Sequence, residues 1–244
     1  MSYPLLSIED LRLTARTGAG DIPLVHGASL TVDRGERVAL VGESGSGKSV
    51  TARAILRLDE GIAATGAIRL EGEDLIDLSE RAMRRVRGRR IGMVFQDPMN
   101  SLDPLRRIGE HLTPLFRARG LNPRQARSET VKLLHELGVP DPGLRAISYP
   151  HEFSGGMRQR VVIAMALAGG PDLLIADEPT TALDVRVQRQ VLQVLSDAAA
   201  ARGLAVLFIT HDVGVVAGFA DRVAVMYRGR IVEIAPVSTF FREA

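Results

Sequence analysis

A run of glycines and serines that ends in a lysine has the residue types needed to bind phosphate. Residues 42–49 follow the spacing G-x-x-x-x-G-K-S, and the apolar residues 38–41 just before them resemble a buried strand. Glycines let several backbone N–H groups turn inward, and the N-terminus of a following helix adds its positive end. Lys48 would reach the β- and γ-phosphates of a nucleotide, and the Ser49 hydroxyl would ligate Mg²⁺. The sequence therefore predicts a phosphate-binding loop made by Gly42, Glu43, Ser44, Gly45, Ser46, Gly47, Lys48, Ser49 and Val50.

Two adjacent carboxylates follow a second apolar run. Residues 173–176 are all apolar and lead directly into Asp177 and Glu178. Acids at the carboxyl end of a buried strand lie at the edge of an open α/β sheet where ligands bind. Asp177 is expected to hold Mg²⁺, and Glu178 is placed to polarise a water for attack on a γ-phosphate. An acidic helix cap is the alternative role, and the phosphate-binding loop favours the catalytic one.

The elements that must position these residues alternate between strands and helices. Apolar runs bounded by turn residues predict strands over residues 5–13, 23–32, 37–41, 65–71, 91–95, 173–176, 205–210, 222–227 and 230–234. Helical spacing of apolar residues predicts helices after the loop, over 155–168 and over 185–200. Residues 104–150 have a helical pattern interrupted by prolines, which indicates an inserted helical lobe. The alternation predicts an α/β fold with a mostly parallel sheet and helices on both faces.

Composition excludes several classes of protein. The 244 residues contain no cysteine, so a disulfide scaffold, a thiolate zinc site and a cysteine nucleophile are excluded. A hydrophobic fraction of 45% is that of a folded protein. The apolar runs fall short of the roughly 20 residues that span a bilayer, and residues 1–10 lack the features of a signal peptide. We therefore expect a soluble protein of the cytosolic type.

The densest basic run does not have the pattern of a nucleic-acid site. The net charge of the chain is only +2, and the run has no aromatic residues between its arginines. Met83 and Val86 have the spacing of an amphipathic helix, so a solvated helix face is expected. Contact with anionic lipid stays open as an alternative. The run consists of Arg81, Arg84, Arg85, Arg87, Arg89 and Arg90.

Further motifs complete an ordered set. Phe153-Ser154-Gly155-Gly156-Met157 precedes the two acids and resembles the signature motif of ABC-type ATPases. Gln96, residues 182–184 after the acids and residues 209–212 around His211 also match motifs of that family. The resemblance extends from about residue 5 to residue 233. Phe153 and Met157 replace the usual leucine and glutamine, and with FQDPMNSLDP at 95–104 and DEPTTALDV at 177–185 they resemble the peptide/nickel branch of ABC importers.

The resemblance implies a fold and a domain plan. It implies a P-loop NTPase (RecA-like) core of α/β class, with an N-terminal antiparallel β subdomain and an inserted α-helical subdomain. The whole chain, residues 1–244, would form one nucleotide-binding domain. Residues 1–96 and 160–244 would make the core with its β subdomain, and residues 97–159 the helical lobe with the signature motif.

It also implies roles for single residues. Gln96 would contact Mg²⁺ and water at the hinge to the lobe, His211 would contact the γ-phosphate, and Glu178 would be the catalytic base. Asp184 would belong to the loop that links the sites of two subunits. ATP and Mg²⁺ are the expected substrate and cofactor. The γ-phosphate of a nucleotide held by another subunit would meet the signature residues, which are Ser154, Gly155 and Gly156.

The partners implied are those of an importer. They are two integral membrane permease subunits, a second ATPase subunit that is identical or paralogous, and, indirectly, an extracytoplasmic substrate-binding protein. The chain would then be peripheral, on the cytoplasmic face of the cell membrane, and would not bind nucleic acid. The sequence leaves open whether peptides or nickel and other metal chelates are carried, and whether a C-terminal extension has been removed.

Other interpretations and one departure from the family accompany this prediction. A non-transport ABC ATPase of DNA repair or translation is the alternative, but no sustained heptads separate Lys48 from Ser154 and only one cassette is present. A regulator without turnover conflicts with Glu178 and His211. Residues 11–17 lack the aromatic residue on which many relatives stack adenine, and Ala15 stands near that place. We therefore expect weak discrimination between bases.

Overall fold

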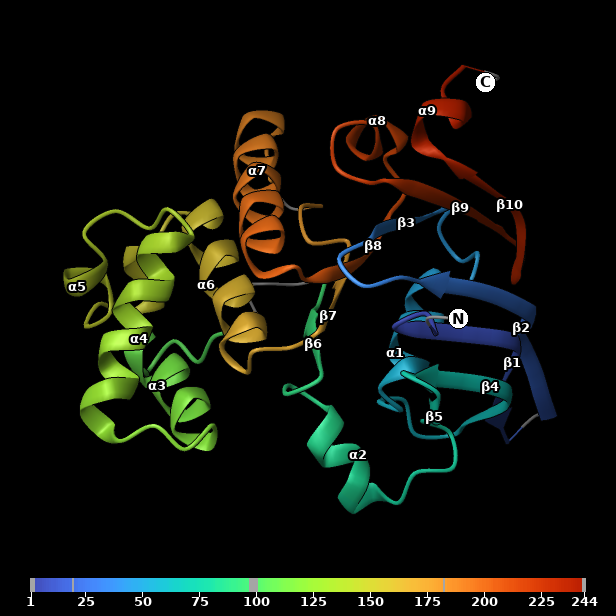
Figure 1. The fold of residues 1–244 in the computed structure, drawn as a ribbon, viewed down its shortest axis with the longest axis horizontal. Helices are drawn as coiled ribbons and strands as arrows, with labels where there is room; N and C mark the ends of the chain where they lie inside the picture. The colour runs from blue at the N-terminus through green and yellow to red at the C-terminus, as the bar shows by residue number, and fades with distance from the viewer. Residues whose placement is uncertain (1–2, 19, 97–100, 182, 243–244) are drawn as a thin grey trace. The chain divides into compact units, whose positions relative to one another are not determined.

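The computed structural model describes residues 3–18, 20–96, 101–181 and 183–242, and the chain forms two compact units (Figure 1). One unit consists of Met1–Arg87 and Ala205–Ala244, and the other of Gly88–Leu204. The predicted boundaries between core and lobe, at residues 96/97 and 159/160, differ from this division of the chain and stay a prediction. Among the described residues, no helix is both long enough and apolar enough to cross a membrane.

The first unit contains an antiparallel sheet built from the N-terminal third of the chain. Its strands are β1 (Leu6–Thr17), β2 (Gly20–Val32), β4 (Ile62–Leu70) and β5 (Glu73–Asp74), in the order β2-β1-β4-β5 (Figure 1). This confirms the antiparallel subdomain and the strands expected there. β1 and β2 extend further than predicted, to the pair Thr17 and Gly20, because backbone pairing continues where apolar alternation has stopped.

A mostly parallel set of strands forms the rest of the first unit. β3 (Arg37–Val41) lies between β8 (Ala205–Thr210) and β9 (Arg222–Tyr227) and is parallel to both, and β10 (Arg230–Pro236) pairs antiparallel with β9. β3 leads through the loop into α1 (Lys48–Ile55). The other helices here are α2 (Glu80–Val86), α8 (Val213–Val216) and α9 (Val237–Phe240).

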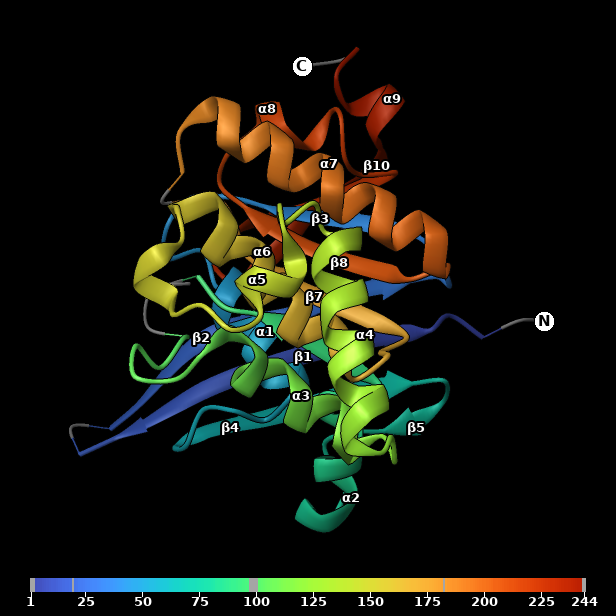
Figure 2. The same cartoon turned by 90° about the vertical axis from the view of Figure 1, so that its left-hand side faces the viewer.

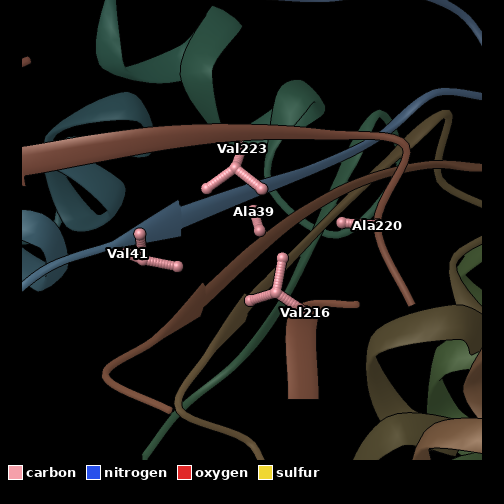
Figure 3. Close-up of a cluster of buried hydrophobic side chains, with 5 residues drawn as sticks. All are labelled: Ala39, Val41, Val216, Ala220 and Val223. Carbon is pink, nitrogen blue, oxygen red and sulfur yellow. The ribbon is translucent and has the colours of Figure 1, made fainter. Parts of the chain in front are cut away.

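A small apolar cluster fixes the end of β3, where the loop begins. Ala39 and Val41 of β3 pack with Val216 of α8, with Ala220 and with Val223 of β9 (Figure 3). β3 and β8 are buried along their length except at Arg37. Their near-continuous apolar sequences are those of strands covered on both faces. The loop therefore starts from a rigid point in the core.

The second unit contains two parallel strands and most of the helices. β6 (Ile91–Val94) pairs with β7 (Leu173–Asp177) in the register Val94 to Ala176. The long helices are α3 (Ile108–Ala118), α4 (Pro123–Glu136), α6 (Gly155–Ala168) and α7 (Val185–Arg202), with the short turns α5 (Pro142–Arg145) and η1 (Pro150–Glu152). Figure 2 shows α3 and α4 beside α6, against which both pack. The helical character predicted for residues 104–150 is confirmed.

The proline within α3 has a local compensation. Pro114 has no N–H for the carbonyl of Glu110, four residues earlier. The guanidinium of Arg106 donates to that oxygen instead, at 3.1 Å. The proline that looked like a helix breaker in the sequence is therefore accommodated inside the helix.

The basic run is divided between a helix and a set of internal contacts. α2 ends at Val86, and Met83 and Val86 are buried, which confirms the amphipathic helix. Arg87 leaves the helix and donates to the carboxylate of Glu80 and to the carbonyl of Leu56. In the second unit, Arg89 donates to the carbonyl of Ala118, and Arg90 pairs with Asp172. These three guanidinium groups are used within the protein.

Candidate active site

The predicted loop folds tightly against the turn of a neighbouring strand. Gly42 directly follows β3, and a Cβ at this position would lie 2.1 Å from the carbonyl oxygen of Met226. No other residue type fits there without a shift of backbone. The Ser46 amide donates to the carbonyl of Glu43 at 3.2 Å, which closes the turn of the loop. The loop has the compact shape that a cradle for phosphate requires.

Lys48 points back into this cradle. Its side chain is buried, and its Nζ donates to the carbonyl oxygens of Gly42 and Glu43, each at 2.8 Å. α1 begins at Lys48, and within the described residues no side chain caps its first turn. The buried Ser46 Oγ also lacks a hydrogen-bond partner among the described residues. A cation, an uncapped helix N-terminus and an orphan hydroxyl fit a phosphate group.

The loop is braced by the predicted hairpin of β9 and β10, through a contact that the sequence did not reveal. The carbonyl of Ser46 accepts a hydrogen bond from the Gly229 amide at 2.8 Å, and the carbonyl of Gly229 accepts one from the His26 amide at 2.7 Å. Arg228 and Gly229 form the two-residue turn between β9 and β10, and both have positive φ, 44° and 75°. A two-residue turn of this kind joins the two strands of a hairpin. Nothing in its sequence indicates contact with residue 46.

Strand register brings His211 to the same edge as the loop. In the parallel pair β3 and β8, Val41 lies opposite Thr210. Gly42 and His211 are the next residues of the two strands, so both follow at the carboxyl edge. The Thr210 hydroxyl accepts from the Asp212 amide at 3.0 Å, which shapes the turn that carries the exposed His211. The first unit thus assembles the loop and the histidine.

The second unit assembles Gln96 and Glu178 in the same way. Val94 lies opposite Ala176, so the residues that follow β6 and β7 meet at one edge. Gln96 Nε2 donates to Glu178 Oε2 at 3.1 Å, and the Thr181 hydroxyl donates to the same oxygen at 2.9 Å. Two donors therefore fix the orientation of the carboxylate. Asp177, the last residue of β7, is buried.

The backbone at Glu178 is strained. Its φ is 47°, in the left-handed region that residues with a side chain rarely adopt, and Pro179 follows it. A conformation of this kind costs about 1–3 kcal/mol and is concentrated at functional sites. Sequence reasoning missed both this strain and Thr181. The only signal for Thr181 is its polar side chain three residues after the glutamate.

The signature residues open α6 beside the start of α7. Ser154 is the N-cap, and its Oγ accepts from the Met157 amide at a long 3.4 Å. A Cβ at Gly156 would lie 2.5 Å from Val187 Cγ1, so only glycine fits this approach without a shift. Asp184 caps α7, and its Oδ1 accepts from the Val187 amide at 3.0 Å. The roles predicted for these residues in a neighbouring subunit's site stay predictions.

Some predicted features are not covered by this geometry. Ala182 of the motif 182–184 and residues 97–100 of the motif 95–104 lie outside the described residues. Among the residues that the structure describes, no group of three or more His, Asp or Glu side chains could hold a metal ion. A magnesium ion here would depend on one carboxylate, neutral oxygens and the phosphates of its nucleotide.

The comparison with protein families decides what these features belong to. A family model described as ABC transporter matches residues 25–181, from β2 through the loop and the signature residues to Thr181. The chain belongs to the ABC transporter family. The family resemblance, the α/β fold class and the ATPase activity predicted from the sequence are thereby confirmed, with ATP as the nucleotide.

Relatives in this ABC family agree along nearly the whole chain. The oligopeptide transport ATP-binding protein OppD of Bacillus subtilis is 51% identical over 97% of this chain and 67% of its own length. A putative peptide import ATP-binding protein of Brucella ovis is 52% identical over 98% of this chain and 73% of its own. These relatives carry transport names, and they give no support to the DNA-repair alternative.

Solved ABC cassettes share the fold. The cassette MJ0796, in a dimeric post-hydrolysis state bound to ADP and Pi, has a TM-score of 0.83 and 29% identity, over 95% of this chain and 98% of that one. The protein cbiO1 of Clostridium perfringens, part of an ABC transporter complex, has a TM-score of 0.84 and 27% identity, over 98% of this chain and 91% of that one.

Proposed function

We propose that this chain is the subunit of a peptide importer that hydrolyses ATP to drive transport. The names of relatives about half identical to it support peptides as the cargo. The nickel and metal-chelate alternative has no such support. The observation that carries the catalytic role is the Glu178 carboxylate, held by Gln96 and Thr181 at the strand edge.

In this proposal the loop and Lys48 bind the β- and γ-phosphates of ATP. Lys48 exchanges its two carbonyl contacts for phosphate oxygens, and the first N–H groups of α1 and the Ser46 hydroxyl add donors. His211, at the edge of the same unit, contacts the γ-phosphate. These groups stabilise charge that builds up on the phosphate oxygens during transfer.

Glu178 acts on the attacking water. It accepts a proton as the water oxygen bonds to the γ-phosphorus and the bond to the bridging oxygen breaks, leaving ADP and inorganic phosphate. Gln96 and Thr181 keep the carboxylate in one orientation during this step. Loss of such a base lowers a rate by roughly 10²–10⁴-fold.

Magnesium would be held by Ser49, Asp177 and Gln96. When bound, the ion neutralises phosphate charge and helps to orient the γ-phosphate. A buried carboxylate at the end of β7 and a half-buried hydroxyl in the first turn of α1 provide the hard oxygen donors that Mg²⁺ prefers.

Turnover is proposed to take place in a head-to-tail dimer. The N-terminus of α6, with Ser154, Gly155 and Gly156, would bind the γ-phosphate of ATP held by the second subunit, and Asp184 would link the two sites. The second subunit is a copy of this chain or a paralogue. The assembly would rest on two permease subunits at the cytoplasmic face of the cell membrane, supplied by an extracytoplasmic binding protein, with no nucleic-acid partner.

Sedimentation of a chemically blocked variant tests this dimer. Glu178→Gln keeps the shape of the site but removes the base, so ATP should persist and hold the dimer together. We expect Glu178→Gln to sediment as a dimer with Mg-ATP and as a monomer with ADP. Adding Ser154→Arg should prevent assembly. If neither the chain alone nor its mixture with a paralogue dimerises with Mg-ATP, the proposal is wrong.

A further inference from the structure

One glutamine of the signature helix is buried without any hydrogen bond. Gln159 on α6 has an exposed fraction of 0%, and neither its Oε1 nor its Nε2 has a partner in the part of the chain that the structure describes. A buried amide without partners is unfavourable, whereas leucine or methionine would fill a similar volume without that cost. In this conformation the amide therefore weakens the fold, which indicates a use in another conformation.

Helical spacing places Gln159 on the face of α6 that carries the signature glycines. Residues three and four positions apart are neighbours on a helix surface, and Gly156 and Gly155 precede Gln159 by these intervals. A Cβ at Gly155 would lie 3.5 Å from Leu183 Cδ2, and one at Gly156 would lie 2.5 Å from Val187 Cγ1. The face that contains Gln159 thus packs toward the turn at residues 183–187.

The same turn is connected to the catalytic carboxylate. The Leu183 amide donates to the carbonyl of Thr180 at 3.1 Å, and the neighbouring Thr181 hydroxyl donates to Glu178. On its other side, Asp184 caps α7 through the Val187 amide. A group that fixes this turn would therefore fix the surroundings of Glu178 and the start of α7 together.

We infer that Gln159 is a positioning residue, whose amide hydrogen-bonds the backbone at Leu183 and Asp184 once ATP has closed the site. The inference rests on the proposed function, in which Ser154, Gly155 and Gly156 bind the nucleotide of a second subunit. Closure gives the amide the partners that it lacks in the free chain, so the closed state is favoured over the free one. The signature residues are thereby coupled to Glu178 of their own chain.

The test compares Gln159→Leu and Gln159→Met with the wild type, in whichever assembly the wild type hydrolyses ATP. Without nucleotide, both variants should melt about 2–4 °C higher, because an unpaired buried amide has been removed. Both should lose about tenfold in kcat while KM for ATP stays within twofold, since the phosphate-binding loop is unaltered. In the Glu178→Gln background, the Mg-ATP dimer should require about tenfold more protein.

Thr130→Val is the matched control. Thr130 is also buried, on α4, but its hydroxyl is paired with the carbonyl of Ala126 at 2.8 Å. This variant should not melt higher and should keep the wild-type kcat. Wild-type kcat in Gln159→Leu would overturn the inference, and so would a lower melting temperature, which would mean that the amide is already bonded in the free chain.

Failure of the proposed dimer would be recognised separately. If Glu178→Gln with an intact Gln159 does not assemble with Mg-ATP, the head-to-tail proposal fails. The melting temperatures and kcat values of the Gln159 variants still decide the positioning role in that case.

Discussion

The two units hold the charged groups that the sequence singles out for catalysis by different means. In the first unit, the contacts are made by backbone atoms. The Lys48 ammonium donates to two carbonyl oxygens, and Gly42 lets the loop lie close to the carbonyl oxygen of Met226. In the second unit, the side chains of Gln96 and Thr181 hold Glu178. Because Lys48 supplies the charge of the phosphate-binding loop, its removal should abolish the ATPase activity. Removing one hydrogen-bond donor from the Glu178 carboxylate should lower the ATPase activity only in part.

The largest effect is expected for Lys48→Ala. The backbone of the loop cannot replace the ammonium group, so ATPase activity should fall below detection and ATP binding should weaken, as measured by calorimetry. Lys132→Ala is the control, because Lys132 is the other lysine of the chain and lies exposed on α4. Wild-type turnover in Lys48→Ala would mean that the loop has been misinterpreted.

A graded loss is expected for Thr181→Val. This variant removes the hydroxyl that donates to Glu178 and keeps the shape of the side chain. We expect kcat to fall about tenfold, equivalent to about 1.4 kcal/mol, with little change in KM. Thr181→Ser keeps the hydroxyl and should stay within about twofold of the wild type. Equal kcat values for the valine and serine variants would show that the hydroxyl does not position the glutamate.

A smaller effect concerns the choice of base, which would depend on the first unit alone. Ala15 of β1 lies opposite Ile22 of β2 and Ile62 of β4, so the residues paired with it in the described part of this sheet are aliphatic. A lost stack is worth about 1–3 kcal/mol. GTP should therefore support hydrolysis with a kcat/KM within about tenfold of that for ATP. A preference for ATP above about a hundredfold would point to an aromatic residue supplied from elsewhere.

The smallest effect is on stability and depends on pH. Burial raises the pKa of Asp221, but hydrogen bonds from the amide and guanidinium of Arg37 outweigh it, and the pKa lies below its usual value. The stabilisation is therefore present above the unfolded pKa of about 4 and is lost as pH falls through the folded value. Because the pair is partly exposed, we expect a shift of only a few degrees in melting temperature.

Asp221→Asn is the variant that measures this contribution. It should melt at a lower temperature than the wild type at pH 7, and the two melting temperatures should converge below pH 4. The ATPase activity of the folded variant should be unchanged. If the difference in melting temperature between the two proteins is the same at every pH, the assignment of the pKa shift to Arg37 is wrong.

The sequence predicted the parts of the molecule that depend on contiguous residues. The loop, the buried strands β3, β7 and β8 and the helix α6 lie where spacing and apolar runs placed them. The position of Glu178 after a strand was predicted for the same reason. These features need only local chemistry and a pattern of burial.

The remaining features depend on which segments meet in the fold. The left-handed backbone at Glu178, the donor at Thr181 and the orphan amide of Gln159 depend on neighbours that sequence spacing does not reveal. The inner residues of β1 were predicted, but its last four residues, 14–17, were not, because they show no apolar alternation. Long-range register, which a single sequence leaves open, decides these cases.

The hairpin turn that braces the loop has a consequence for protein engineering. A two-residue surface hairpin is ordinarily a good place to insert a tag or a fluorophore. Here the Gly229 amide and carbonyl connect Ser46 to His26, so an insertion would pull on the phosphate-binding loop from outside. The surface connection between α3 and α4, at Gly120 and Leu121, would accept a label without that link. A reporter dye placed at Arg228 would instead register changes in the loop itself.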